Sequence, residues 1–284
     1  MEETKLNNNE KKRETPVVVF SNNKGGVAKT SSAIATAGVL FQMGKKVLFV
    51  DGDPQCNSTK ALNAFTGEGI PTIIDLITNT GTIEEVIQKD NIEESKKNNN
   101  QKVRYFDVVP GDKDLNSAEE FMRADIFCLK KHIDQVKDNY DIVIFDTNPA
   151  INILLTVIYT AATHIVIPVE PDPFSADGIE TLYRYIEEER ENANPDLKIA
   201  GILITQYDGR TNVAQIASAM ISQIASLLKT KTFDTKIRDC VRVPESHTVS
   251  MPLTIFRRKC TASDDYYSFV NELLETINEE IMEN

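Results

Sequence analysis

Residues 17–32 read VVVFSNNKGGVAKTSS, and the rest of the chain can be interpreted outward from them. The four apolar residues at 17–20 predict a short strand that is buried on both faces. Gly25 and Gly26 end this apolar stretch, and residues 30–43 then carry apolar side chains at helical spacing. The apolar face of that helix consists of Ile34, Ala37, Gly38 and Phe41. A strand, a glycine turn and a helix in this order predict the first unit of an α/β sheet.

Further apolar runs follow along the chain. They cover residues 47–50, 105–109, 142–145, 165–169 and 199–204, and most are continuous and rich in β-branched residues. Helical patterns lie between them, for example at 115–137 and 176–192. This alternation predicts an α/β fold with a twisted, mainly parallel sheet flanked by helices on both faces. We expect a disordered tail at 1–15, a single domain at 16–284 and a polar surface insertion at 93–102.

The composition limits the possible functions. Of the 284 residues 41% are hydrophobic, enough to bury a core, and 43 acidic side chains against 31 basic ones give a net charge of −12. Binding to nucleic acid therefore needs a local basic patch. The four cysteines form no CxxC pair, which favours reduced thiols in a reducing compartment. The sequence has no apolar leader and no run of 18 apolar residues, so we expect a cytoplasmic protein.

The turn at 24–30 has the chemistry of a phosphate-binding loop. Gly25 and Gly26 let backbone N–H groups approach phosphate oxygens, and the helix that follows directs its positive end at the same anion. Lys29 offers a charge to the β- and γ-phosphates, and the Thr30 hydroxyl can bind Mg²⁺. The residues expected to contact nucleotide here are Lys24, Gly25, Gly26, Val27, Ala28, Lys29, Thr30 and Ser31. The alternative is a glycine-rich surface turn flanked by lysines, which the acidic motifs described next disfavour.

Carboxylates follow two of the predicted strands. Residues 50–55 read VDGDPQ, and residues 142–146 read IVIFD, a Walker B pattern. The carboxyl ends of strands meet at the phosphate-binding edge of such a sheet. By position, Asp53 orients or deprotonates the attacking water, Asp51 supports the Mg²⁺ shell, and Asp146 holds Mg²⁺ beside Thr30. The alternative for Asp53 is a solvated acid in a common turn.

The motif K-G-G-x-x-K-T resembles the deviant Walker A motif of the ParA/MinD ATPases, and the ParA branch resembles this chain over about residues 16–275. The resemblance implies ATP and Mg²⁺ as cofactors and a homodimer that encloses ATP. In that family the lysine at position 24 reaches across the dimer to the partner's ATP phosphates, so Lys24 joins Lys29 and Asp53 as a catalytic residue. Most members carry glycine where Ala28 stands, so we expect nucleotide affinity or turnover to differ from the family norm.

Two further segments resemble the family. Residues 205–211 read TQYDGRT and match a strand end that approaches adenine in relatives, which implies contacts from Thr205 and, in a later loop, from Pro244. The usual D-x-P-P after the second acid is here DTNP, at residues 146–149, so the conformation of the switch loop is left open.

The resemblance also implies a purpose for ATP hydrolysis, which is DNA partition. Residues 229–259 carry eight basic and three acidic side chains, a local charge of +5 in an acidic chain. The candidates for nonspecific DNA contact are Arg238, Arg242, Arg257, Arg258 and Lys259. A solvated charged surface is the alternative for each of them. The expected partner is a centromere-binding ParB-like adaptor, and the expected location is the nucleoid.

Three other functions are considered. MinD-like membrane binding needs a basic amphipathic C-terminal helix, but residues 272–284 carry five glutamates and no lysine or arginine. The apolar stripe at 265–284 therefore favours packing on the core, and no membrane contact is expected. Positioning of a protein cluster or organelle on the nucleoid stays open. Metabolic relatives are disfavoured, because the cysteines are poorly placed for an iron–sulfur site and no substrate pocket is identified.

Overall fold

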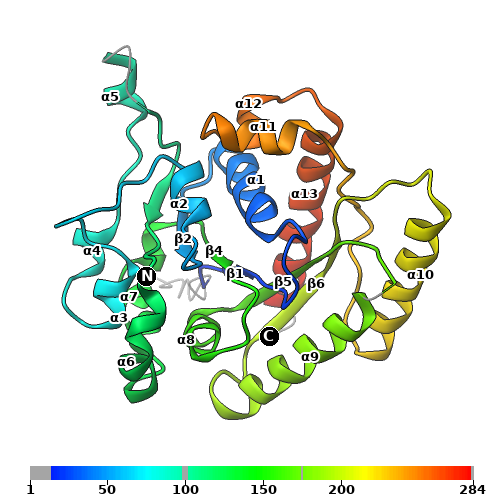
Figure 1. Ribbon diagram of the computed structural model, residues 1–284, viewed down its shortest axis with the longest axis horizontal. Helices are drawn as coiled ribbons and strands as arrows, with labels where there is room; N and C mark the ends of the chain where they lie inside the picture. Colours follow the sequence, from blue (N-terminus) through cyan, green and yellow to red (C-terminus); the bar gives the residue numbers. More distant parts are fainter. Residues whose placement is uncertain (1–13, 98–101, 174, 283–284) are drawn as a thin grey trace, which may run out of the picture.

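The computed structural model describes residues 14–97, 102–173 and 175–282 and has a six-stranded, fully parallel sheet (Figure 1). The strands are β1 Val17–Phe20, β2 Val47–Gly52, β3 Asp107–Val109, β4 Ile142–Thr147, β5 His164–Val169 and β6 Lys198–Ile204. Their order in the sheet is β3-β2-β4-β1-β5-β6. The predicted tail falls almost entirely on residues 1–13, which lie outside the described residues.

The register brings the functional strand ends together. Phe20, the last residue of β1, pairs with Asp146 of β4, and Asp146 pairs on its other side with Asp51 of β2. The glycine loop leaves β1 at this same level. The loop and both acids therefore meet at the carboxyl edge of the sheet, as expected for an α/β fold that binds ligands there.

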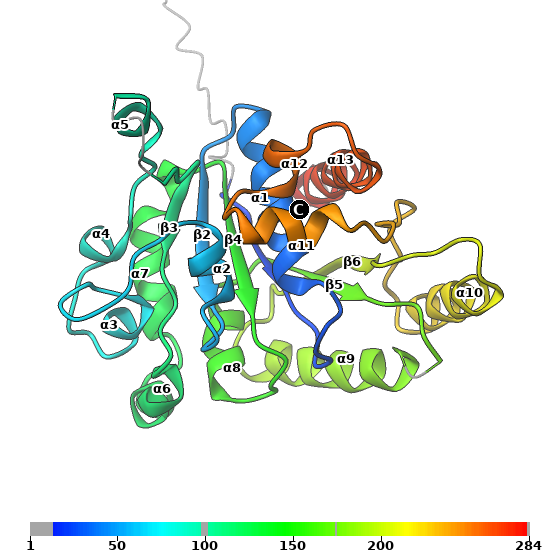
Figure 2. The same ribbon diagram turned by 45° about the horizontal axis from the view of Figure 1, so that its top comes forward.

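Helices cover both faces of the sheet (Figures 1 and 2). Their bounds are α1 Lys29–Gln42, α2 Asn57–Ala61, α3 Ile73–Ile77, α4 Ile83–Val86, α5 Ile92–Lys97, α6 Glu119–Ala124, α7 Cys128–Val136, α8 Ile153–Ala161, α9 Ser175–Asn192, α10 Asn212–Leu227, α11 Arg242–Thr248, α12 Leu253–Phe256 and α13 Thr261–Met282. Two short 3₁₀ helices are η1 Leu115–Ala118 and η2 Lys137–Asn139. Alternate residues of each strand face two separate cores. Val17 and Val19 pack with α7, α8 and α9, and Val18 and Phe20 pack with α1 and α13.

The helix predicted at 115–137 is wrong as a continuous element. It is divided into η1, α6, α7 and η2, with a break after α6. At the break Asp125 has an extended conformation, and its carboxylate accepts a hydrogen bond from the Phe127 N–H (3.1 Å) and pairs with Lys131. A short polar side chain that binds nearby backbone competes with helix continuation. Apolar spacing alone does not reveal such a break.

Two smaller differences occur around β3. The predicted strand at 105–109 begins only at Asp107, and the Tyr105 ring, which precedes the strand, packs on Phe41 (5.7 Å between centroids). The predicted polar insertion at 93–102 is partly helical, since α5 covers its first residues, and residues 98–101 lie outside the described part of the chain.

Helix α13 packs on the sheet, as its apolar stripe predicts. Tyr266, Phe269, Leu273 and Ile277 are buried in the same core as α1. The side chain of Ile281, the last stripe residue, lies outside the described set. Within the described segments, every helix is too short or too polar to cross a bilayer.

Candidate functional site

The glycine loop has an open concave surface. Gly26 has φ +80°, a left-handed conformation that favours glycine, and Ala28 has φ 60° and ψ 30°. A Cβ atom added at Gly25 or Gly26 would meet no heavy atom within 4 Å. The space in front of these two residues can therefore accept a ligand close to the backbone.

Other segments hold this loop by its carbonyl oxygens. The Thr205 hydroxyl donates to the Val27 carbonyl (3.1 Å), and the Gln206 amide donates to the Gly26 carbonyl (2.7 Å). The Lys29 ammonium donates to the Lys24 carbonyl (2.8 Å). These three bonds use carbonyl oxygens of the loop, so they hold its shape without occupying the N–H groups of Gly25 and Gly26.

Two adjoining cavities surround the loop. The first, about 510 Å³, is lined by four residues shared with the second and by Gly25, Lys29, Thr30, Asp53, Asn57, Lys60, Ala61, Thr147, Pro149 and Ser250. The shared residues are Gly26, Ala28, Ser31 and His247. The second cavity, about 290 Å³, includes Thr205, Gln206, Asp239, Cys240, Pro244 and Tyr266. The structure therefore brings Thr205 and Pro244, both proposed as base contacts, beside the predicted phosphate loop.

Asp146 is fully buried beside the loop. One of its oxygens accepts a hydrogen bond from the Ser58 hydroxyl (2.5 Å), and the other, Oδ1, is buried without a hydrogen-bond partner among the described residues. Burial, and next the neighbouring Asp51, raise the pKa of Asp146 to about 7. The hydrogen bond from the Ser58 hydroxyl opposes this shift. An unpaired buried carboxylate oxygen beside a threonine hydroxyl fits a divalent cation.

Asp51 is held by hydrogen bonds from its own chain, and its support of the Mg²⁺ shell stays a prediction. Its Oδ2 accepts hydrogen bonds from the Thr59 N–H (2.8 Å) and hydroxyl (2.6 Å), and its Oδ1 accepts one from the Asp53 N–H (3.1 Å). Burial raises the pKa of Asp51 to about 6. These bonds fix the start of α2 and the backbone of Asp53. Asp51 therefore positions the segment that carries Asp53.

Asp53 and Lys29 both line the first cavity. Asp53 is 7% exposed, and its Oδ1 accepts a hydrogen bond from the Gln55 N–H (2.8 Å). Burial lowers the pKa of Lys29, and the charges of Asp146 and Asp53 oppose that shift. Gly52 allows this close arrangement, because a Cβ at that position would lie 2.9 Å from the Asp146 carbonyl oxygen. One ammonium group thus lies among carboxylates that repel one another.

Lys24 forms an ion pair with Asp172, in the connection between β5 and α9. The Lys24 N–H also donates to the side-chain oxygen of Asn22 (2.9 Å). In this conformation Lys24 is held by its own chain. The sequence motif does not identify Asp172 as its partner, because the two residues are 148 positions apart.

The predicted DNA-contact residues have different surroundings. Arg238 pairs with Asp265 (2.6 Å), and Arg242 pairs with Glu245 (2.6 Å), so acids neutralise both. The Arg257 guanidinium lies 5.0 Å from the Phe256 ring centroid. Arg258 and Lys259 are exposed and have no acidic partner in the described part of the chain. Among the five predicted DNA-contact residues, those without an acidic partner in the described segments are therefore residues 257–259, between α12 and α13.

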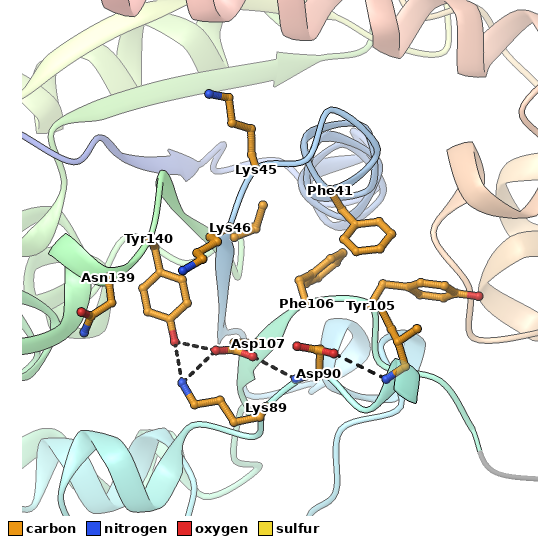
Figure 3. A pocket seen from close by; sticks show the side chains of 12 residues that line it. Phe41, Lys45, Lys46, Lys89, Asp90, Tyr105, Phe106, Asp107, Asn139 and Tyr140 are labelled. Atoms are coloured by element: carbon orange, nitrogen blue, oxygen red, sulfur yellow. Dashed lines mark hydrogen bonds and ion pairs between the residues drawn. The ribbon is translucent and has the colours of Figure 1, made fainter. Parts of the chain in front are cut away.

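A third cavity, about 370 Å³, lies at the opposite, amino edge of the sheet (Figure 3). Its polar wall is already bonded internally: Lys89 donates to Asp107 (2.9 Å), and the Tyr140 hydroxyl also donates to Asp107 (2.7 Å). Phe41, Tyr105 and Phe106 form the apolar wall. This cavity is separate from the glycine loop and takes no part in the site.

The loop, the buried ammonium group and the strand-end carboxylates define a P-loop nucleotide-binding protein. Residues 15–199 match the AAA domain family, and the chain belongs to this family, the ParA/MinD group of P-loop ATPases.

Individual relatives agree with that assignment. The chromosome partitioning protein ParA of Myxococcus xanthus is 28% identical over 262 residues, which cover 91% of this chain and 88% of the relative. The chromosome-partitioning ATPase Soj of Treponema pallidum is 30% identical over 261 residues, which cover 90% of this chain and 96% of that relative. A solved complex of McdA from Cyanothece with ATP has a TM-score of 0.78 at 20% identity, and the match covers 92% of this chain and 96% of McdA. The two proteins therefore share the fold.

Ala28 is a strained residue in this site, and replacing it tests that strain. Alanine in the left-handed region costs about 1 kcal/mol relative to glycine, so Ala28→Gly is expected to raise the free energy of unfolding by about that amount. Urea unfolding measures the change. Ala219→Gly, at an exposed position inside α10, is the matched control and should lower stability by about 1 kcal/mol. Loss of stability in both variants would contradict the strain at Ala28.

The buried acids make stability depend on pH in a defined direction. The pKa of Asp146 is raised to about 7 and that of Asp51 to about 6, whereas unfolded aspartates titrate near 4. Between pH 7.5 and 5.5 the folded nucleotide-free protein therefore takes up protons that the unfolded chain does not, and its stability rises as pH falls. In Asp146→Asn this rise should be smaller by on the order of 1–2 kcal/mol. Urea unfolding at both pH values measures the difference, and equal slopes for the two proteins would contradict it.

Proposed function

We propose that this protein hydrolyses ATP with Mg²⁺ and uses the nucleotide cycle to control binding to nonspecific DNA during DNA partition. The convergence of Lys29, Asp53 and Asp146 on one glycine loop is the observation that carries the ATPase proposal. The Gly25 and Gly26 backbone binds phosphate oxygens, and the second cavity accepts the base. Bound Mg²⁺, held by Thr30 and Asp146, supplies positive charge that offsets the charge of the phosphates.

The residues divide the chemistry among them. Lys29 neutralises the phosphates, and in doing so its ammonium group remains close to Asp146 and Asp53. Asp53 is placed to orient the attacking water and to accept its proton. The cavity wall of Thr147 and Pro149 comes from the switch segment that follows Asp146. These roles leave Asp51 as the residue that fixes Asp53 in place.

Lys24 has a role in a homodimer that closes around ATP. In the conformation described here it pairs with Asp172 of its own chain. On dimer closure Lys24 leaves Asp172 and places its ammonium group near the partner's ATP phosphates, where it stabilises the developing charge. Hydrolysis is accordingly slow in the monomer and is stimulated when an adaptor protein of the ParB type favours the closed state.

The proposed DNA surface is connected to the nucleotide site through α11. Pro244 and His247 of this helix line the base cavity, and α12 and the basic residues 257–259 follow directly. A change at the nucleotide can therefore move the basic segment, and a dimer doubles its charge. Arg258 and Lys259 are the strongest candidates, since Arg238 and Arg242 are already paired with acids. On this proposal the protein is a cytoplasmic ATPase that associates with the nucleoid.

DNA binding measured with ATP, with ADP and without nucleotide tests the partition function. Wild type is expected to bind mainly with ATP, and the triple change Arg257→Ala, Arg258→Ala and Lys259→Ala should weaken binding about tenfold or more and lower the salt slope. The control replaces Arg123, Lys130 and Lys131, three basic residues of α6 and α7 that pair with acids. Binding that is absent or independent of nucleotide would overturn the DNA function and leave the ATPase intact.

A further inference from the structure

Helix α10 is a 16-residue helix with an exposed face, and it carries no charged residue. Its 16 residues, Asn212–Leu227, include no Asp, Glu, Lys or Arg, although 26% of the whole chain is charged. Three of its apolar side chains are unusually exposed: Val213 at 58%, Ile216 at 62% and Leu227 at 81%. Met220, between them, is also exposed. A solvated helix face normally carries charged residues, so this face has the character of a contact surface.

The exposed residues follow a regular repeat. Val213, Ile216, Met220, Gln223 and Leu227 are separated by three, four, three and four positions, the a/d spacing of helices that pair with other helices. Four of the five are apolar, and Gln223 is the single polar member. The opposite face of α10 is already used, because Ala214, Ala217, Ile221 and Ala225 are buried against the body of the protein.

The location of α10 separates this face from the nucleotide site. Both ribbon views place it at the outer edge of the molecule, beyond α9 and β6, while the glycine loop lies between β1 and α1 (Figures 1 and 2). The face is therefore distinct from the loop side, on which the proposed ATP-dependent dimer closes.

We propose that the exposed face of α10 docks on α10 of a second copy of this chain, independently of nucleotide. The charges favour this occupant. At a net charge of −12 most surfaces of two copies repel each other, whereas the α10 faces meet without bringing like charges together. An uncharged face also matches an uncharged partner without leaving a buried charge unpaired. Because of the heptad spacing, each α10 presents its exposed residues in one row that can pack against the same row of the other helix.

The size of the face sets the strength of the contact. A helix of 16 residues covers little more than two heptads, about 24 Å. Such a pair buries less than the roughly 1,200 Å² of a stable dimer interface, so the free protein associates weakly. The contact becomes strong when another interaction holds several copies together, because the effective concentration then rises to about the millimolar range. In this way α10 links ATP-closed dimers into larger assemblies.

Sedimentation velocity of the full chain tests the proposal, without nucleotide and with ATP, over about 1 to 100 µM protein. Without nucleotide, wild type is expected to show a concentration-dependent monomer–dimer equilibrium. The double change Ile216→Lys and Met220→Lys should weaken it at least tenfold, and Gln223→Leu, which completes the apolar seam, should strengthen it about tenfold. The control is Phe121→Lys with Phe127→Lys, two exposed apolar residues near the β3 end of the sheet, far from α10, and should leave association unchanged (Figure 2). Circular dichroism and ATP binding confirm that each variant is folded.

The outcomes separate this contact from the nucleotide cycle. With ATP, wild type should form species larger than a dimer, the α10 double variant should stop at the dimer, and Lys29→Ala should keep only the nucleotide-independent equilibrium. If wild type and Gln223→Leu are both monomeric without nucleotide at every concentration, the proposal is wrong, whatever ATP does. It is equally wrong if the double variant associates like wild type.

Discussion

Lys29→Ala is expected to lower ATP affinity by about 100-fold or more, since loss of a charge-assisted contact in a buried site costs roughly 3 kcal/mol or more. The physical reason lies in the surroundings of Lys29. Its ammonium group is buried, and it donates to the Lys24 carbonyl oxygen and faces Asp146 and Asp53. Without it the triphosphate enters a cavity lined by Asp53 and, of the lysines, by Lys60 alone among the described residues. Fluorescence titration with a labelled ATP analogue measures the loss.

Lys45→Ala is the matched control for this change. Lys45 lies at the amino edge of the sheet, 3.9 Å from Asp141, and lines the third cavity. Its removal should leave ATP affinity within about twofold, because a screened surface pair contributes little. Binding by Lys29→Ala equal to that of wild type would remove the basis for a phosphate site at this loop.

The residues that the sequence predicts for the centre of this site lie together in the structure, because their positions depend on local residue types. A tight turn that approaches phosphate needs Gly25 and Gly26, and a strand that ends at the ligand edge identifies Asp146 from its apolar run alone. The same logic places Thr205 and Pro244 near the loop through a resemblance to relatives. These residues can be predicted because each one must be of a particular type and must occupy a particular position between a strand and the helix that follows it.

Partners that are distant in sequence are not predictable in this way. Ser58 donates to Asp146 across 88 residues, and Asp172 pairs with Lys24 across 148. Arg238 finds Asp265 on α13, an acid outside the basic stretch in which it is counted. The net charge counted over residues 229–259 therefore included Arg238 as a free cation, although Asp265 pairs with it. For Arg242 the partner Glu245 lies three residues away on α11, a spacing that could have been recognised.

The surroundings of the three acids explain why their roles differ. Asp51 has the largest number of protein hydrogen bonds, Asp146 keeps one buried oxygen unpaired, and Asp53 lines the first cavity. A carboxylate saturated by Thr59 and the Asp53 N–H is poorly suited to bind metal or water. The unpaired oxygen of Asp146 suits a cation, and a proton acceptor must contact the space where water enters. Only Asp53 among the three meets that last condition.

Asp53→Ala is therefore expected to separate binding from hydrolysis. A positioned general base contributes about 10²- to 10⁴-fold, so single-turnover phosphate release should slow by about 100-fold or more. ATP affinity should stay within about threefold, because loss of a negative charge near the phosphates offsets the loss of order in the segment. The variant is expected to accumulate in the ATP-bound state, as closed dimers if Lys24 acts across the interface. Quench-flow and analytical ultracentrifugation measure the two effects in the same sample.

Two comparisons make this result specific to Asp53. Asp196→Asn, at an exposed position in the turn before β6, removes a carboxylate far from the loop and should hydrolyse ATP like wild type. Asp51→Asn disturbs the hydrogen bonds to Thr59 and to the Asp53 backbone, so it should lower both stability and hydrolysis, whereas Asp53→Ala lowers hydrolysis alone. If Asp53→Ala hydrolyses ATP at the wild-type rate while Asp51→Asn is folded and inactive, the water is activated by Asp51. The division of roles among the carboxylates would then be reversed, although the loop, Lys29 and Asp146 would keep theirs.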